Sequence, residues 1–452
     1  MHKSDLEIAE IIAEQAAFKG GRAYFVGGCV RDWIMGKENK DLDIEIHGLP
    51  CEDVKAILDS IGDCITAGSS FGVFKLKGRN IDVALPRSET GTGRGGHKDF
   101  EVNVDPYIGL KKAAGRRDFT VNALMQDIIS GEIADFFGGV DDIRNSILRH
   151  VNDLAFSEDP LRVLRGCRFA ARLGFSIADE TVDLCRKMDL SRLSPERIMG
   201  ELENVLLKAE HPSVFFEELK NMDGLSFWFP ELKDLTGIRQ DPAFHPEGDV
   251  WIHTMKTLDE AAKLRSHAEN PLWFMFSALC HDLGKSIATE EINGVIHAYG
   301  HDEKGLELAD RFLSRLTNET NLKKYILNMV WLHMRPNMLI QQKATEKAFM
   351  KLFDLSVSPE DLILLSKADY YGSSASSYDS MESELKEMIS EYRRRMALPY
   401  VKGEDLIAAG AIPGPDFGKA LEYAHKLRLA GVDKKEALTQ TIGYLKHLEH
   451  SN

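Results

Sequence analysis

The sequence predicts an α+β protein in which a mixed-sheet head is followed by an entirely helical remainder. In the first third of the 452-residue chain, short β-type runs alternate with helical runs. From about residue 141, long helical periodicity takes over and continues to the end. Turn residues cluster near Glu247 and Gly248, at Tyr370–Ser380 and at Ala411–Gly418, which indicates breaks between packed units.

Composition restricts the class of protein. Hydrophobic residues make up 43% and charged residues 28%, which is typical of a globular protein. No run approaches the roughly 18 apolar residues of a membrane span, and the amino terminus lacks a secretory apolar stretch, so we expect a cytoplasmic protein without a membrane partner. The net charge of −15 argues against indiscriminate binding to nucleic acid, so any RNA contact must be local.

The first strand of the predicted head ends in a turn suited to phosphate. The segment FVGGCVRD, Phe25–Asp32, is a strand, a Gly-Gly turn and a helix start. Such a turn directs backbone N–H groups and a helix N-terminus at whatever lies above it. Gly28 and Arg31 are therefore candidates for contact with a phosphate group.

Three aspartates follow the turn on predicted strands. In DLDIEIHG a period of two places Asp41, Asp43 and Glu45 on one face. Close carboxylates repel each other unless a cation lies between them, and Mg²⁺ is the usual partner beside phosphate. Asp82 in IDVALP adds a third carboxylate if its strand lies alongside, which predicts a two-metal phosphoryl-transfer site. The alternative for an isolated DxD is that the aspartates solvate an edge strand.

Two further segments complete the predicted head. Pro86–Glu101 is rich in glycine and too irregular for a strand or a helix, so we expect it to be mobile. RRDFTVNAL, Arg116–Leu124, is typical of a capped helix start, in which Asp118 accepts first-turn N–H bonds and Asn122 lies one turn on, on the same side. The alternative to a functional role is that Asp118 only caps the helix and that Arg116 and Arg117 are exposed to solvent.

The helix that begins at EDPLR carries a pattern suited to reading a base. Asp159 suits the N-cap and Pro160 the first helical position, which places Arg162 along the same edge. A carboxylate only accepts hydrogen bonds and a guanidinium only donates them, so the pair matches cytosine and adenine and opposes uracil and guanine. Arg165 and Arg168 continue the same stripe and are expected to hold a triphosphate. The alternative is a helix with salt-bridged arginines.

A second candidate site lies far downstream in helical contexts. It consists of His253, the pair His281–Asp282, and Asp369. Imidazole and carboxylate groups from three helices suit a divalent transition metal that activates water. His301 and His333 could extend the set to a second ion. We expect His297 to be a satisfied core histidine.

Four motifs in order carry a family resemblance. GGCVRDWIMG with DLD, RRDFTVNAL, and EDPLRVLRGCRFAARLGF closely resemble the class II tRNA nucleotidyltransferase and bacterial poly(A) polymerase family. The resemblance implies that Asp41 and Asp43 bind Mg²⁺, that the Gly27–Gly28 turn and Arg31 hold triphosphate, and that Asp159 with Arg162 replaces a nucleic-acid template. It also implies that the nucleotide-binding residues include three from the second motif: Arg117, Asp118 and Asn122. One departure is KKAAG, where relatives often carry an acidic pair.

Other segments extend the resemblance over nearly the whole chain. SPERIMGEL matches a further motif, in which we interpret Glu196, Arg197 and Glu201 as braces for the reading helix. A loop at 86–101 couples to the switch from C to A in CCA-adding members, which favours full CCA addition here with Arg87 and Glu89 as participants. The H…HD…D pattern resembles HD-domain metal phosphohydrolases, as in multifunctional bacterial CCA-adding enzymes.

The resemblance implies a function and a division of the chain. We expect a nucleotidyltransferase that adds or repairs the CCA end of tRNA from CTP and ATP, with HD-type phosphatase and 2′,3′-cyclic phosphodiesterase activity. The cofactors are Mg²⁺ in the head and Mn, Ni, Co or Fe in the HD site. The alternatives are a poly(A) polymerase, an enzyme that adds only A or only CC, or an RNA-binding head beside an active HD domain. The expected divisions are a head at 1–143, a neck at 144–240, an HD domain at 241–375 and a helical tail at 376–452.

Overall fold

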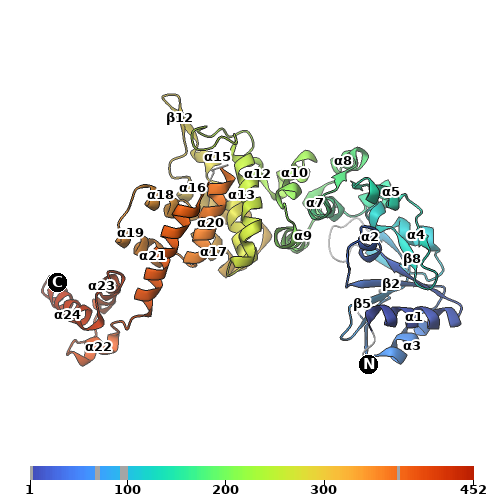
Figure 1. Ribbon diagram of the computed structural model, residues 1–452, viewed down its shortest axis with the longest axis horizontal. Helices are drawn as coiled ribbons and strands as arrows, with labels where there is room; N and C mark the ends of the chain where they lie inside the picture. The colour runs from blue at the N-terminus through green and yellow to red at the C-terminus, as the bar shows by residue number, and fades with distance from the viewer. Residues whose placement is uncertain (1–3, 67–71, 92–99, 374–376, 452) are drawn as a thin grey trace. The chain divides into compact units, whose positions relative to one another are not determined.

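The computed structural model describes residues 4–66, 72–91, 100–373 and 377–451. The chain divides into two compact units, Met1–Trp228 and Phe229–Asn452. The predicted α+β class is confirmed, because a mixed sheet lies in the first unit and the second unit is almost entirely helical (Figure 1). Among the described residues, no helix is both long and apolar enough to span a bilayer.

The head is built on a seven-stranded sheet with the order β3-β4-β5-β2-β1-β8-β9. The strands are β1 (Arg22–Val26), β2 (Leu42–His47), β3 (Cys64–Thr66), β4 (Val73–Leu76), β5 (Ile81–Ala84), β8 (Met125–Asp127) and β9 (Ile133–Ala134). β2 and β5 run parallel, and the other neighbouring pairs are antiparallel. A parallel pair needs a long crossover, which α3, β3 and β4 supply here.

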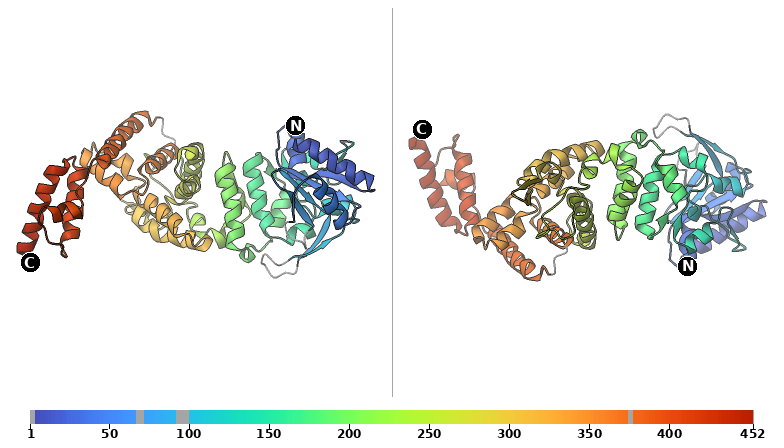
Figure 2. Two further views of the ribbon diagram at one scale, coloured as in Figure 1. Left: turned by 90° about the horizontal axis from the view of Figure 1, so that it is seen from below. Right: turned by 90° about the horizontal axis from the view of Figure 1, so that it is seen from above.

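Two helices cover one face of this sheet. α1 (Asp5–Phe18) and α3 (Cys51–Ile61) lie side by side there (Figures 1 and 2). α1 begins with a capping box, in which the Ser4 side chain accepts the Glu7 N–H and the Glu7 carboxylate accepts the Ser4 N–H. Its buried residues Ile8, Ile12 and Ala16 recur every four positions, so one stripe of the helix packs on the strands.

Short helices connect the sheet to a helical neck within the first unit. The elements are α2 (Gly28–Ile34), α4 (Leu110–Gly115), η1 (Thr120–Asn122), α5 (Gly139–Arg144), α6 (Asp153–Ser157), α7 (Leu161–Leu173), α8 (Asp179–Cys185), η2 (Leu190–Arg192), α9 (Pro195–Lys208), α10 (Ser213–Asn221) and α11 (Leu225–Trp228). α7 packs against α9 and α10, and β10 (Ile147–Leu148) pairs with β11 (Ser176–Ile177). Phe119 makes edge-to-face contacts with Phe156 of α6 and with Phe169 of α7.

The glycine-rich segment at 86–101 is more ordered at its ends than the sequence predicts. β6 (Arg87–Gly91) pairs antiparallel with β7 (Phe100–Val104), in a register that sets Arg87 opposite Val104. Sequence analysis predicted that this segment forms neither a strand nor a helix, and for its two ends that prediction is wrong. The pairing uses main-chain groups, which the composition of the segment does not reveal. The predicted mobility concerns mainly residues 92–99, which lie outside the described residues.

The second unit is a set of packed helices. They are α12 (Pro230–Lys233), α13 (Val250–Leu264), η3 (Arg265–His267), α14 (Pro271–Cys280), α15 (Lys285–Ala288), α16 (His301–Leu316), α17 (Thr320–Leu332), α18 (Arg335–Gln341), α19 (Glu346–Leu355), α20 (Pro359–Gly372), α21 (Asp379–Ala397), α22 (Gly403–Ala408), α23 (Phe417–Leu429) and α24 (Lys434–Ser451). α13 packs against α20 and α14. A Cβ at Gly372 would lie 2.1 Å from Thr257 Oγ1, so this glycine allows α13 and α20 to approach closely.

One hairpin interrupts the helices of the second unit. β12 (Glu290–Ile292) pairs with β13 (Val295–His297). The turn residues Asn293 and Gly294 have φ values of 53° and 83°, as a type I′ turn requires. His297 is half-buried on β13 and stacks on Tyr299, so its assignment to a helical core is wrong. The Asn-Gly pair is a strong hairpin signal that the surrounding helical periodicity obscured.

The last three helices share a core of their own. Leu406 of α22, Ala420 and Ala424 of α23, and Ala437 and Leu445 of α24 are buried together. These helices form the red group in Figure 2. The small alanine side chains allow α23 and α24 to pack closely.

Candidate functional site

The first candidate site is a cavity of about 520 Å³ in the first unit. Seven arginines and three aspartates stand in its wall. The lining residues are Gly27, Gly28, Arg31, Asp43, Arg87, Arg116, Arg117, Asp118, Asn122, Asp159, Leu161, Arg162, Arg165, Phe169 and Arg197. The excess of guanidinium groups suits a ligand with several phosphates. The structure thus brings most of the predicted head residues to one place, with Asp41, Asp82 and Arg168 outside the lining.

The carboxylates predicted to hold metal lie on two adjacent strands. Asp43 on β2 is paired in register with Asp82 on the parallel strand β5, so the two side chains emerge on the same face. Asp41 directly precedes β2. Burial, followed by the charges of Asp82 and Asp41, raises the pKa of Asp43.

These carboxylates fit a divalent ion. Asp82 Oδ1 accepts no hydrogen bond and lies 3.3 Å from Lys75 Nζ. Mutual repulsion of carboxylates on one face is relieved when a hard cation binds between them. The fit rests on the chemistry of the donors and on the strand register.

Glu45 shares this face of β2 but is not open to solvent. It is 1% exposed, and its carboxylate lies 2.9 Å from His47 Nε2, 3.3 Å from Arg117 Nη2 and 3.5 Å from Arg116 Nη2. Although burial opposes ionisation, these partners hold the pKa of Glu45 at about 2. Glu45 therefore anchors two of the arginines that line the cavity.

We expect Glu45→Gln to lower the free energy of unfolding by about 3 kcal/mol at pH 7, because it leaves the two half-buried arginines without their buried counter-charge. The folded pKa lies below the ordinary value of 4.5, so the carboxylate stabilises the fold above that pH and ceases to do so as the pH falls toward about 2. Urea-induced unfolding of the wild-type protein and of Glu45→Gln, at pH 7 and at pH 3.5, measures the difference in their free energies of unfolding. This difference should be smaller at pH 3.5. Glu52→Gln, at an exposed position on α3, is the control. If the difference in the free energy of unfolding is the same at both pH values, the ionised Glu45 carboxylate is not its cause.

The Gly-Gly turn stands where sequence analysis placed it. Gly27 has a φ of 74°, and a Cβ there would lie 3.2 Å from Arg117 Nη1. Arg31 Nη1 donates to Asn122 Oδ1 at 2.7 Å. The turn, Arg31 and the second motif therefore form one wall of the cavity.

Asp118 acts differently from the prediction. The segment after it is a 3₁₀ turn that begins beyond Phe119, so the predicted helix cap by Asp118 is wrong. Asp118 Oδ1 accepts the Phe119 N–H at 2.8 Å, and Oδ2 accepts Arg165 Nε at 2.8 Å and Nη2 at 2.6 Å. Burial opposes ionisation, but Arg165 holds the pKa of Asp118 below its usual value. Asn122 also donates to Asp118, at 3.1 Å, which agrees with the prediction that they lie on the same side.

The two residues predicted to read the base stand at the start of α7. The helix begins at Leu161 with Pro160 as its cap residue, one position later than predicted. The Asp159 carboxylate nevertheless accepts the Leu161 N–H at 3.0 Å. Arg197 Nη2 holds Asp159 at 2.9 and 2.7 Å, so the predicted brace from Arg197 is confirmed.

Arg162 is held separately from Asp159. Its guanidinium donates to the carbonyl of Ala155 at 2.6 Å and to the carbonyl of Arg116 at 2.8 Å. Both Asp159 and Arg162 line the cavity. The Asp159 carboxylate, a hydrogen-bond acceptor, and the Arg162 guanidinium, a hydrogen-bond donor, are therefore each held in place in the wall of the same cavity.

Arg168 is not among the residues that line the cavity. It is buried, ion-paired with Glu201, and stacked on the Phe169 ring at 4.2 Å. An α-helix turns by about 100° per residue, so each step of three drifts by roughly 60° and Arg168 no longer shares the edge of Arg162. The structure therefore does not bring Arg168 to the residues expected to hold triphosphate.

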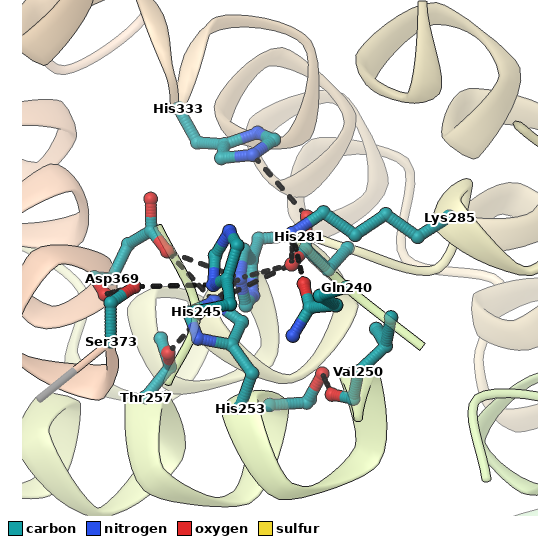
Figure 3. A network of polar contacts seen from close by, with 12 residues as sticks. Gln240, His245, Val250, His253, Thr257, His281, Lys285, His333, Asp369 and Ser373 are labelled. Atoms are coloured by element: carbon teal, nitrogen blue, oxygen red, sulfur yellow. Dashed lines mark hydrogen bonds and ion pairs between the residues drawn. The ribbon is translucent and has the colours of Figure 1, made fainter. Parts of the chain in front are cut away.

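The second candidate site brings together the four predicted metal ligands, of which His253, His281 and Asp369 are labelled in Figure 3. His253 lies on α13, His281 and Asp282 directly follow α14, and Asp369 lies on α20. His253 Nε2 is 2.9 Å from Asp369 Oδ1 and 3.3 Å from His281 Nε2. Side chains from three segments that are distant in sequence thus converge on one largely buried point.

Among the described residues, three groups of side chains could hold a metal ion, and two of these groups meet at Asp282. One group is His253, His281 and Asp369, and the other is Asp282, His301 and His333. Asp282 Oδ2 lies 3.2 Å from His281 Nε2, and Oδ1 lies 3.1 Å from His301 Nε2. Neither Asp282 oxygen accepts a hydrogen bond of good geometry, although the residue is 1% exposed. Buried imidazole and carboxylate donors fit divalent transition ions, and the shared Asp282 fits a pair of them.

Sequence analysis missed two residues that support this site. The Glu247 carboxylate lies 2.9 Å from His253 Nδ1 and 2.9 Å from His245 Nδ1. A carboxylate on the second ring nitrogen fixes the tautomer and orientation of a metal-binding imidazole. Despite burial, the two histidines lower the pKa of Glu247 to about 2. The sequence signal for these two residues was the His-x-Glu spacing in HPEGD. We interpreted that segment only as a turn between packed units.

Family models match most of the chain. "Poly A polymerase head domain" covers residues 23–149, "Probable RNA and SrmB- binding site of polymerase A" covers 174–236, and "HD domain" covers 250–372. The multifunctional CCA protein of Actinobacillus pleuropneumoniae is 36% identical over 361 residues, which span 77% of this chain and 85% of that protein. The multifunctional CCA protein of Pasteurella multocida is 39% identical over 302 residues, which span 65% of this chain and 69% of that protein.

Solved structures share the fold along the whole chain. The CCA-adding enzyme of Bacillus stearothermophilus in complex with CTP has a TM-score of 0.67 at 22% identity, with 100% of both chains covered. The CCA-adding enzyme of Thermotoga maritima complexed with tRNA has a TM-score of 0.63 at 20% identity, with 97% of this chain and 95% of that chain covered. At these identities the likeness concerns the arrangement of the elements.

Proposed function

Because this chain belongs to the family of multifunctional CCA proteins, we propose that it adds or repairs the 3′-terminal CCA of tRNA from CTP and ATP. The observation that carries the proposal is the cavity in which Asp43, the Gly27–Gly28 turn and the Asp159–Arg162 pair meet. The three functions required for template-independent addition, namely metal binding, phosphate binding and base selection, have residues there. A tRNA substrate also favours a cytoplasmic protein.

The proposed reaction joins one nucleotide at a time. The RNA 3′-hydroxyl oxygen attacks the α-phosphorus, the bond to the bridging oxygen breaks, and pyrophosphate leaves. Mg²⁺ held by Asp43, with Asp41 and Asp82, would lower the barrier to attack and neutralise the triphosphate. Arg31, Arg117 and Arg165 bind the phosphates as they leave, and Asn122 orients Arg31.

The alternatives differ in the nucleotides that are joined. A poly(A) polymerase adds adenosine without cytidine, and partial enzymes add only CC or only A. Incubation with CTP alone and a tRNA that ends before CCA is the direct test, since failure to add C rejects the leading proposal. The products with CTP, with ATP and with both, separated on one gel, distinguish the remaining alternatives.

Base selection is expected to depend on Arg162. Arg162→Ala removes the donor beside the Asp159 acceptor, so preference for CTP over UTP should fall about tenfold to a hundredfold, as one mispaired polar contact implies. Single-turnover incorporation of each nucleotide measures the preference. Arg172→Ala, an exposed arginine on the same helix, is the matched control. Unchanged selectivity in Arg162→Ala removes the base-reading role.

We also propose a second activity at the HD site. The buried histidines and aspartates hold divalent transition ions, with Mn, Ni, Co or Fe as candidates, and the site hydrolyses phosphate esters such as nucleoside 2′,3′-cyclic phosphates. Water adds to phosphorus and one ester P–O bond breaks. The four-part division at 143, 240 and 375 remains a prediction.

A further inference from the structure

An aromatic side chain lies among the arginines of the first cavity. Phe169 on α7 lines that cavity and is 8% exposed. The guanidinium carbons of three arginines lie over its ring, with Arg168 at 4.2 Å, Arg165 at 5.4 Å and Arg31 at 5.5 Å from the centroid. Arg31 belongs to α2 and the other two belong to α7, so a single ring contacts cations from two helices.

The positive charges around this ring repel one another. Burial lowers the pKa of Arg168, and the positive charge of Arg165 lowers it further, although Glu201 opposes the shift. Each guanidinium has at least one acceptor of its own. These pairs are Arg31 with Asn122, Arg165 with Asp118, and Arg168 with Glu201. The acceptors lie on different elements, and the Phe169 ring is the group that all three cations share.

The ring attracts these cations without cancelling their charge. The face of an aromatic ring is negative, and its attraction for a guanidinium is stronger where water is excluded. A carboxylate in the place of Phe169 would also attract the arginines, but it would repel a triphosphate. Arg31 and Arg165 line the cavity and Arg168 does not, so the ring acts on a ligand through the first two.

We propose that Phe169 is a positioning residue for the triphosphate of the incoming nucleotide, because its ring holds Arg31 and Arg165 together in the cavity wall. The identity of this ligand rests on the proposed function. CTP and ATP carry the same triphosphate, so the ring has the same effect on both. Asp159 and Arg162 are held by other groups, so the choice of base does not depend on the ring.

The test compares the full-length wild-type protein with Phe169→Leu, which keeps an apolar side chain and removes the ring. Calorimetry with inorganic tripolyphosphate measures binding to the arginines without a base or an RNA, and Arg165→Gln identifies the binding phase that belongs to this cavity. We expect about tenfold weaker binding in Phe169→Leu, and a KM for CTP that rises by a similar factor while kcat stays within about twofold. Phe169→Tyr restores an aromatic ring and should return both values to within about threefold of the wild type.

Two comparisons distinguish positioning from a general loss of packing. Phe215→Leu, at a fully buried ring on α10, which packs against α7, is the matched control and should bind tripolyphosphate as the wild type does. The preference for CTP over UTP should be unchanged in Phe169→Leu, since a displaced α7 would move Arg162 and reduce that preference. Thermal unfolding measures whether each variant is folded, and Phe169→Met replaces Phe169→Leu if the latter is not.

The outcomes separate this inference from the proposed function. Binding of tripolyphosphate by Phe169→Leu at the wild-type affinity overturns the positioning role. An equal loss in Phe215→Leu, a loss that Phe169→Tyr does not reverse, or a reduced preference for CTP over UTP also overturns it. If the predicted binding pattern is found but the wild-type protein adds no cytidine to tRNA that ends before CCA, the positioning role stands and the proposed function fails.

Discussion

Nucleotide addition is expected to fall by roughly a thousandfold or more when Asp43 is replaced by alanine, since we propose that Asp43, Asp82 and Asp41 hold Mg²⁺ together as one unit. Asp43 is the aspartate of this set that lines the cavity, and it is paired in register with Asp82 on the neighbouring strand. Removing it leaves too few carboxylates to hold Mg²⁺ beneath a triphosphate. Incorporation of CTP into tRNA that lacks CCA, measured in a single turnover, checks the prediction.

Two controls make this result specific. Asp53→Ala, on α3 of the same unit, removes a partly exposed aspartate that pairs with Lys19 and should leave addition unchanged. Hydrolysis of 2′,3′-cyclic AMP by Asp43→Ala should persist, because the HD ligands belong to the second unit. Addition at the original rate in Asp43→Ala would remove the basis of the proposed mechanism.

Replacement of Asp282 by asparagine is expected to have the second large effect, a loss of cyclic phosphate hydrolysis of about a thousandfold. Asp282 joins both groups of metal ligands, and its two oxygens accept no well-aligned hydrogen bond. The variant should therefore also bind less metal, which elemental analysis of the purified protein measures. Asp369→Asn tests the first group separately.

The matched control is another aspartate paired with a histidine. Asp354 pairs with His425 at 2.7 Å, outside both ligand groups. Asp354→Asn should retain hydrolysis and metal content. Full metal content in Asp282→Asn, together with full activity, would contradict the assignment of Asp282 as a shared ligand.

The sequence predicted the residues whose roles depend on local pattern. Asp43 and Asp82 follow from strand alternation, and His281–Asp282 follows from the pattern of imidazole and carboxylate groups on helices. What brought Asp43 and Asp82 together was the parallel pairing of β2 and β5. That pairing was assumed in the prediction and is now observed.

Features that depend on long-range contact were not predictable in the same way. Glu247 supports His253 from a loop, so no periodicity marked it. Arg168 satisfied a spacing of three, but α9 brings Glu201 to it and removes it from the cavity edge. The strands β6 and β7 are held by main-chain pairing in a segment whose composition favours turns. In each of these cases, tertiary packing decides the position of the residue or strand and overrides what the local sequence pattern indicates.

The parallel register of β2 and β5 has a consequence for how this protein tolerates insertions. Side chains alternate along a strand, so a slip of one position would turn Asp82 to the opposite surface of the sheet while most backbone bonds re-form. Gly78 lies on an exposed turn between β4 and β5, so a change of length there should be neutral for catalysis. A single residue inserted within Ile81–Ala84 should turn Asp82 away from Asp43 and silence the enzyme.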